Sequence, residues 1–108
     1  MSDKTPIEPI RWQPEKDGRL SESALRAKLE RLGYSVTRYV YPPGTFFPDH
    51  SHGADKMDAV LSGRFRIVLA GHEMVLEAGD MVAVPAGAVH SAQVIGNEPV
   101  VNLDGLKM

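Results

Sequence analysis

The sequence predicts a small all-β domain preceded by an N-terminal arm and one short helix. The chain has 108 residues, which suits a single domain. One helical pattern lies near the N-terminus, and short β-rich segments separated by turn residues occupy everything after Gly33. Hydrophobic residues make up 43% of the chain and charged residues 24%, as in folded globular proteins. We therefore expect residues 1–33 to form the arm and helix, and residues 34–108 to form the β domain.

The first nineteen residues are rich in residues that interrupt a helix: Pro6, Pro9, Pro14 and Gly18. This segment is therefore expected to run extended and to form no helix. Its apolar side chains are Ile7, Ile10 and Trp12. They predict that the arm packs either on its own barrel or on a neighbouring subunit.

A helix is predicted from Ser21 to Leu32. Ser21 is a suitable N-cap, because its hydroxyl can accept a hydrogen bond from a free backbone N–H of the first turn. Leu25, Leu29 and Leu32 recur at i, i+4 and i+7, so they form one apolar stripe. Gly33 follows, where a left-handed C-cap is favoured.

The rest of the chain predicts strands. Seven segments are rich in β-branched, aromatic or other apolar residues: Tyr34–Tyr41, Met57–Leu61, Phe65–Leu69, Met74–Leu76, Met81–Val84, Val89–Ile95 and Val100–Leu103. The Pro-flanked pair Phe46 and Phe47 is predicted to lie in a loop, with core packing or the mouth of a pocket as its role. Asp80, after Gly79, is expected to accept backbone N–H groups of a turn. Short strands at a spacing of about 8–12 residues indicate a sandwich or a barrel.

Charge and composition exclude several classes of partner. The net charge is −2 and no run of Lys and Arg can follow a phosphate backbone, so nucleic acid is not expected to bind. No apolar run approaches the ~20 residues that span a bilayer, and the N-terminus has no apolar signal core. We therefore expect a cytoplasmic protein without membrane contact. The chain has no cysteine, so any metal must be held by histidine nitrogen and by carboxylate or water oxygen.

Two of the four histidines, His50 and His52, are separated by one residue. On a strand, residues i and i+2 face the same side, so these two imidazoles can converge on one ion. His90 lies in a later strand, and only the fold can bring it close to them. A lone His-x-His pair is more often a polar surface feature, so spacing alone does not decide. His72, at a predicted hairpin tip, is expected to be solvated.

Both histidine segments resemble the two motifs of the cupin family. The first reads GTFFPDHSHGADKMDAVLSG over residues 44–63, and the second reads GDMVAVPAGAVHSAQV over residues 79–94. Glycines, histidines and the Pro-x-Gly turn match the family pattern in register, and the likeness covers about residues 34–106. The resemblance implies a single cupin β-barrel, also called a jelly roll or double-stranded β-helix. It also implies a divalent metal ion bound by His50, His52 and His90.

Two positions depart from the family pattern: Lys56 replaces a glutamate that ligates the metal in relatives, and Val94 replaces an asparagine. A protonated lysine repels a cation, so a metal retained by three histidines and a lost metal both remain open. Asp58 is expected to share the face of Lys56 and either to ligate the metal or to neutralise the lysine. Alternatively, Lys56 points out of the barrel and pairs with Asp55 or a neighbour. Zinc, iron, manganese, nickel and copper all accept imidazole ligands.

The resemblance does not specify the chemistry, because cupins include enzymes, storage proteins and sensor domains. One hypothesis is a metal-dependent enzyme on a small organic substrate, with Lys56 and Asp58 as general acid or base. The alternative is a non-catalytic binding or sensing module, with or without metal, whose pocket is made apolar by Ala92, Val94 and phenylalanine side chains. A purely structural role ranks third. The family resemblance and the apolar arm also lead us to expect a homodimer.

Overall fold

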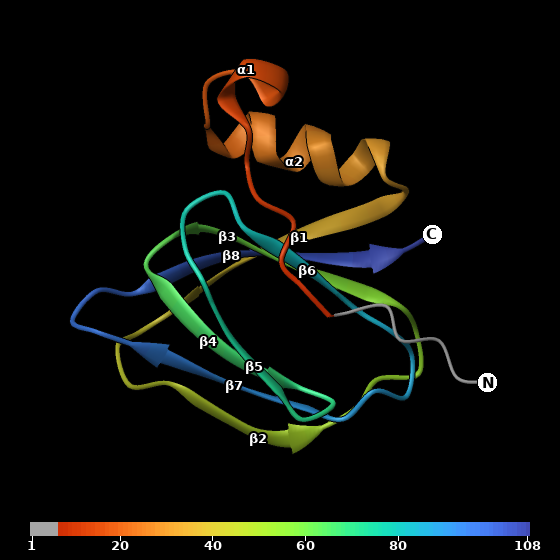
Figure 1. The fold of residues 1–108 in the computed structure, drawn as a ribbon, viewed down its shortest axis with the longest axis vertical. Helices are drawn as coiled ribbons and strands as arrows, with labels where there is room; N and C mark the ends of the chain where they lie inside the picture. The colour runs from red at the N-terminus through yellow and green to blue at the C-terminus, as the bar shows by residue number, and fades with distance from the viewer. Residues whose placement is uncertain (1–6) are drawn as a thin grey trace.

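The computed structural model describes residues 7–108 and consists of two four-stranded antiparallel sheets that face each other (Figure 1). Sheet A has the strand order β1-β8-β3-β6, and sheet B has the order β2-β7-β4-β5. The strands are β1 (Tyr34–Tyr41), β2 (Phe46–His50), β3 (Lys56–Ser62), β4 (Arg64–Leu69), β5 (His72–Leu76), β6 (Met81–Val84), β7 (His90–Ile95) and β8 (Val100–Lys107). This arrangement confirms the predicted all-β barrel. No helix among the described residues is long and apolar enough to cross a membrane.

Apolar side chains from both sheets fill one part of the space between them. Eleven buried residues form this inner core: Val60, Phe65, Ile67, Leu69, Met74, Leu76, Val82, Val84, Ala92, Val94 and Val100. The alternation of buried and exposed residues along β4 and β7 matches the period of two of a strand that faces the core on one side. The polar side chains of the inner faces are thereby concentrated beside this core.

Helix α2 (Glu22–Arg31) packs on the outer face of sheet A (Figure 1). Ser21 is its N-cap, as predicted, and the Ser21 hydroxyl accepts a hydrogen bond from the Ala24 backbone N–H at 3.1 Å. Leu25 and Leu29 are fully buried, whereas Leu32 is 43% exposed. A second core forms under the helix, from Leu25, Leu29, Met57, Ala59, Met81 and Leu103.

The prediction that the first nineteen residues form no helix is wrong for one short turn. Helix α1 spans Pro14–Asp17, four residues, with Pro14 in its first turn. Proline is tolerated at that position because its missing N–H would have no intrahelical partner. Asp17 then accepts hydrogen bonds from the Gln13 backbone N–H at 2.8 Å and from Lys28 Nζ at 2.9 Å. Pro6, part of the same prediction, lies outside the described residues.

The arm packs on its own barrel, one of the two predicted alternatives. Ile10 forms an antiparallel bridge with Met81 on β6, the edge strand of sheet A, through backbone hydrogen bonds of 2.7 and 3.0 Å. Trp12 lies against Gly79, where an added Cβ would come within 2.5 Å of the Trp12 Cβ. Gly79 also has a φ of +90°, so this position requires glycine for two reasons.

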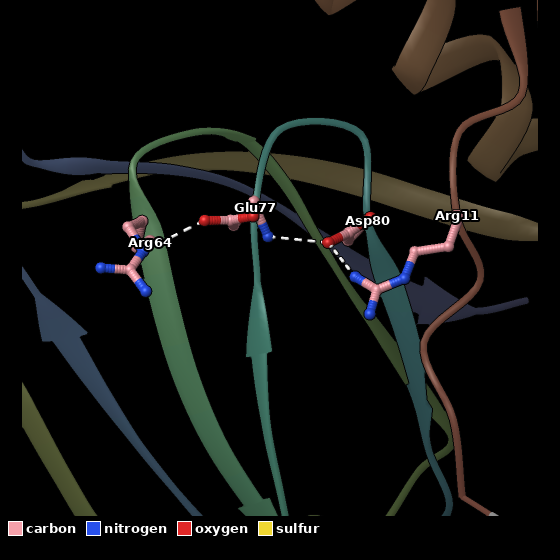
Figure 2. Close-up of polar contacts among 4 residues, drawn as sticks. All are labelled: Arg11, Arg64, Glu77 and Asp80. Atoms are coloured by element: carbon pink, nitrogen blue, oxygen red, sulfur yellow. Dashed lines mark hydrogen bonds and ion pairs between the residues drawn. The ribbon is translucent and has the colours of Figure 1, made fainter.

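Ionic contacts connect the arm to the turn before β6. Figure 2 shows Arg11 paired with Asp80, and the Asp80 carboxylate also accepts a hydrogen bond from the Glu77 backbone N–H at 2.9 Å. The Glu77 side chain in turn pairs with Arg64 at 3.1 Å. Asp80 therefore has the predicted role in the turn, and in addition it anchors the arm.

Phe46 and Phe47 belong to a strand, not to the predicted loop. Strand β2 contains Pro48 and pairs only with β7, at the edge of sheet B, where proline is tolerated because one side of the strand needs no hydrogen bonds. The register with β7 shifts between Phe47 and His50. The two phenylalanines face opposite sides: Phe46 is 58% exposed, and Phe47 packs against the inner core.

The burial of the helix stripe predicts unequal effects of two leucine substitutions. Leu29→Ala should lower the free energy of unfolding by about 2–5 kcal/mol, because it leaves a cavity under α2. Leu32→Ala, on the same stripe but 43% exposed, should cost less than about 1 kcal/mol. Urea denaturation of the two variants measures both values. Equal decreases in the free energy of unfolding would show that the leucine stripe does not pack α2 against the sheet as described.

Candidate metal centre

The fold brings together three histidines that are far apart in the sequence. His50 is the last residue of β2 and pairs in register with His90, the first residue of β7. Each of His50, His52 and His90 offers a ring nitrogen within 4.8 Å of the others. The ring centroids are 4.2 Å apart for His50 and His90, 4.9 Å for His50 and His52, and 5.1 Å for His52 and His90.

His50 and His52 converge as predicted. Strand β2 ends at His50, and His52 lies in the following loop. The two ring centroids are 4.9 Å apart, although only His50 belongs to the strand. The loop is held by a hydrogen bond from the Gly87 backbone N–H to the His52 carbonyl oxygen, at 2.9 Å. Gly87 belongs to the turn that precedes His90, so the same contact ties both histidine segments together.

Backbone carbonyl groups orient two of the rings. His50 Nδ1 lies 2.7 Å from the Pro48 carbonyl oxygen, and His90 Nδ1 lies 3.0 Å from the Ala88 carbonyl oxygen. A carbonyl oxygen only accepts, so each Nδ1 carries a proton, and each Nε2 is the nitrogen that can ligate a metal. Burial, followed by the positive charge of Lys56, lowers the pKa of His52. This ring therefore stays neutral, as a metal ligand must.

The histidines form one wall of a cavity of about 250 Å³. Its lining has three parts: the imidazoles, an aromatic and aliphatic wall, and a polar group from sheet A. The lining residues are Tyr39, Tyr41, Phe47, His50, His52, Lys56, Asp58, Phe65, Val84, His90, Ala92 and Asp104. Ala92 lines the cavity as expected, whereas Val94 lies in the inner core. His72 is exposed, and it is not part of the three-histidine group.

Lys56 points into the cavity and pairs with Asp104, whose Oδ2 lies 2.9 Å from Lys56 Nζ. The ion pair is therefore formed with neither Asp58 nor Asp55, the two residues named as candidates. Asp55 instead accepts a hydrogen bond from the Ala86 backbone N–H at 2.8 Å. Sequence reasoning missed Asp104 because its prediction of the last strand ended at Leu103, and only the pairing of β8 with β3 places Asp104 beside the lysine.

Asp58 shares the face of Lys56, as predicted, and lines the same cavity. It lies directly opposite Asp104 in the β3–β8 pairing and accepts a hydrogen bond from Asn102 Nδ2 at 3.1 Å. Burial and the neighbouring Asp104 carboxylate raise the pKa of Asp58. Burial, together with both carboxylates, also raises the pKa of Tyr41 to about 12, so its hydroxyl keeps its proton at neutral pH.

The residues present fit a divalent metal ion. Three imidazoles whose ligating nitrogens lie within 4.8 Å of one another can bind zinc or another first-row ion and leave positions open for water or a ligand. The positive charge of Lys56 is balanced by Asp104, so the cavity does not present an unpaired cation to the ion. Asp104 thereby compensates for the positive charge of Lys56 within the same wall of the cavity.

Comparison with known proteins gives one family and one curated relative. The family model for the cupin domain matches residues 37–104. A germin-like protein from Mesembryanthemum crystallinum is 34% identical over 89 residues, which cover 72% of this chain and 38% of the germin-like protein. The chain thus spans well under half the length of this relative.

Solved structures share the same fold. The DMSP lyase DddQ from Ruegeria pomeroyi has a TM-score of 0.63 and 25% identity, over 70% of this chain and 39% of that chain. A predicted oxalate decarboxylase from Thermotoga maritima has a TM-score of 0.63 and 23% identity, over 75% of this chain and 72% of that chain. The matched residues include both histidine segments and most of the barrel, and the chain therefore belongs to the cupin domain family.

Proposed function

We propose that this protein binds one divalent metal ion through His50, His52 and His90, and that the ion activates a small organic substrate in the adjacent cavity. One observation carries the proposal: three histidine ring nitrogens converge within 4.8 Å at the wall of a cavity of about 250 Å³. Zinc, iron, manganese, nickel and copper all suit imidazole ligands. A cavity of this size suits a small metabolite.

The side chains around the histidines have different proposed roles. A bound ion polarises a substrate oxygen or activates a water molecule. Lys56 and Asp58 line the cavity beside the histidines and are the candidate acid–base residues. The Tyr41 hydroxyl keeps its proton and can donate a hydrogen bond to a substrate oxygen. Phe47 and Phe65 exclude water and bury the apolar part of the substrate.

A first substrate panel follows from this chemistry and from the relatives. Keto acids, enols and sugars carry oxygens that a divalent ion polarises, and they fit a cavity of this size. DMSP belongs in the panel because a structural neighbour with 25% identity is a DMSP lyase. Oxalate belongs there because another neighbour is described as a predicted oxalate decarboxylase.

A non-catalytic binding module is the second candidate. The observation in its favour is Lys56, which stands in the ion pair with Asp104 where relatives place a metal-ligating glutamate. Thermal-shift screening with the same panel separates the candidates, because a ligand that binds the folded state raises the melting temperature whether or not it is turned over. Stabilisation without turnover by the metal-loaded protein favours binding alone.

The three-histidine site predicts one metal ion per chain. Protein purified without a nickel column and titrated with zinc should bind one equivalent, measured by calorimetry and elemental analysis. His90→Ala should lower the affinity at least about a hundredfold, because only two imidazoles remain. His72→Ala is the matched control, since His72 is exposed and outside the group, and it should bind zinc like the wild type. Zinc binding that survives His90→Ala would reject the site.

Substitution of Lys56 is predicted to change zinc affinity in the opposite direction. Lys56→Gln removes a positive charge near the histidines and leaves Asp104 unpaired, so zinc affinity should rise about tenfold. Arg64→Gln is the control, because it also removes a positive charge from an ion pair, but at an exposed position. Competition with a zinc-chelating dye measures the affinities. Equal affinity of Lys56→Gln and wild type would mean that the lysine charge does not act on the ion.

We also propose that the protein is a homodimer. The arm packs on its own barrel, so the surface that favours a dimer is β1, a free edge of sheet A. Tyr39 and Val40 on this strand are 44% and 49% exposed. An unpaired edge strand with exposed apolar side chains can pair with a second copy.

The edge-strand proposal predicts a dimer that one substitution separates. Sedimentation velocity at micromolar concentration should show a dimer for the wild type and a monomer for Val40→Glu, because the new charge would lie in the apolar contact between the two copies. Val89→Glu is the control, since Val89 is equally exposed at 53% but lies outside β1. A monomeric wild type would contradict the proposal.

A further inference from the structure

A ladder of polar side chains occupies the inner face of β3 and β8 in sheet A and lines the cavity. Lys56 and Asp58 are two positions apart on β3, and Asn102 and Asp104 are two positions apart on β8. The two residues of each pair therefore face the same side of the sheet. The register places Asp58 directly opposite Asp104. Residues opposed in this way have Cβ atoms about 4.5–5.5 Å apart, so the two carboxyl groups are within reach of each other.

The hydrogen bonds of the ladder leave two oxygens without a donor. Asp104 Oδ2 accepts from Lys56 Nζ at 2.9 Å, and Asp58 Oδ1 accepts from Asn102 Nδ2 at 3.1 Å. Asp104 Oδ1 and Asn102 Oδ1 are buried and have no hydrogen-bond donor among residues 7–108. One cation therefore faces two carboxyl groups, and a buried acceptor lacks a partner beside Asp58.

We propose that Asp58 and Asp104 hold one proton between them, carried by Asp58 and donated to Asp104 Oδ1, and that the pair is the acid–base group of the cavity. A single proton removes the repulsion between two opposed carboxylates and supplies the missing donor. The location of the proton on Asp58 follows from Lys56, whose ion pair keeps Asp104 ionised. The catalytic part of this inference rests on the proposed function.

The other groups around Asp58 agree with this assignment. Burial and the Asp104 carboxylate are the largest causes of the raised pKa of Asp58, and Asn102, Lys56 and His90 oppose them more weakly. Tyr41, on β1, is uncharged at neutral pH because its pKa is about 12. The titratable groups that line the same cavity are Tyr39, Tyr41, His50, His52, Lys56, His90 and Asp104. Lys56 is the cation among them that contacts the pair.

This arrangement gives the lysine and the aspartates separate roles. Asp58 gives its proton to a basic atom of the substrate, and the resulting pair of carboxylates takes a proton from another substrate atom. The proton count and the electron count of the protein are unchanged after one cycle, so no oxidant or reductant is required. The reaction class is an isomerisation or an elimination in which a proton moves between two substrate atoms, and Lys56 keeps Asp104 charged throughout.

Carbon-13 NMR of aspartate carboxyl groups in the metal-free protein tests the pair. The Asp58 resonance, assigned by its loss in Asp58→Asn, should titrate above the ordinary aspartate range. Asp104→Asn should move its midpoint to lower pH, because the neighbouring negative charge is gone. Asp80→Asn is the control: Asp80 pairs with Arg11 and does not line the cavity, so the Asp58 midpoint should not move. The proposal is overturned if the Asp58 titration midpoint lies in the ordinary aspartate range and does not change in Asp104→Asn.

Stability against pH gives an independent measurement that does not depend on Asp104→Asn folding. A raised native pKa means that the folded state binds the proton more tightly, so stabilisation by that proton is present at low pH and is lost as pH rises through the raised value. Asp58→Asn imitates the protonated acid, since its amide can donate to Asp104 and still accept from Asn102. Its stability relative to wild type, from urea denaturation, should rise as pH increases. A constant difference contradicts a shared proton.

Zinc binding and turnover by the same samples separate this inference from the proposed function. If Asp58 titrates as proposed but the protein binds no zinc, the metal site is rejected and the shared proton is retained. If the protein binds zinc but Asp58 titrates in the ordinary aspartate range, the shared proton is rejected and the metal site is retained. For any substrate of the panel that is turned over, Asp58→Asn should lower kcat at least about a hundredfold and leave the zinc content unchanged. An unchanged kcat would remove Asp58 from the reaction.

Discussion

The antiparallel register of strands that are distant in sequence is the constraint on which the site depends. His50 meets His90 because β2 pairs with β7, and Asp58 meets Asp104 because β3 pairs with β8. Side chains on a strand alternate between faces, so a shift of one residue in either pairing would turn these groups away from the cavity. The apolar inner core on the same faces opposes such a shift, since it would expose buried side chains. Packing of the barrel and formation of the site are therefore coupled.

Charge balance within the cavity explains how a lysine is accommodated beside the three histidines. Lys56 is held by Asp104, and Asp104 faces Asp58, so the extra positive charge is enclosed in a local network. A buried charge without a partner would be strongly unfavourable. The substitution at one position of the motif is thus accommodated by acidic residues outside the family pattern. In such a network the charge of each member depends on the others.

The N-terminal segment stabilises the barrel from outside. Ile10 extends sheet A beyond its edge strand β6, and Arg11 and Trp12 bind the turn before that strand. Helix α2 covers the outer face of the same sheet with Leu25 and Leu29. These contacts give sheet A a covered outer face, and they hold in place the strands that carry Lys56, Asp58 and Asp104.

Local patterns in the sequence predicted most of the helices and strands and the candidate ligands. The leucine spacing predicted α2, the turn residues separated most of the strands, and the motif register identified the three histidines. The sequence did not reveal α1 or β2, because the proline rules on which those predictions rested make exceptions for first helical turns and edge strands. The partner of Lys56 and the opposition of Asp58 and Asp104 were decided only by tertiary structure. Both depend on cross-strand pairing over 44 or more positions, and no local pattern contains that information.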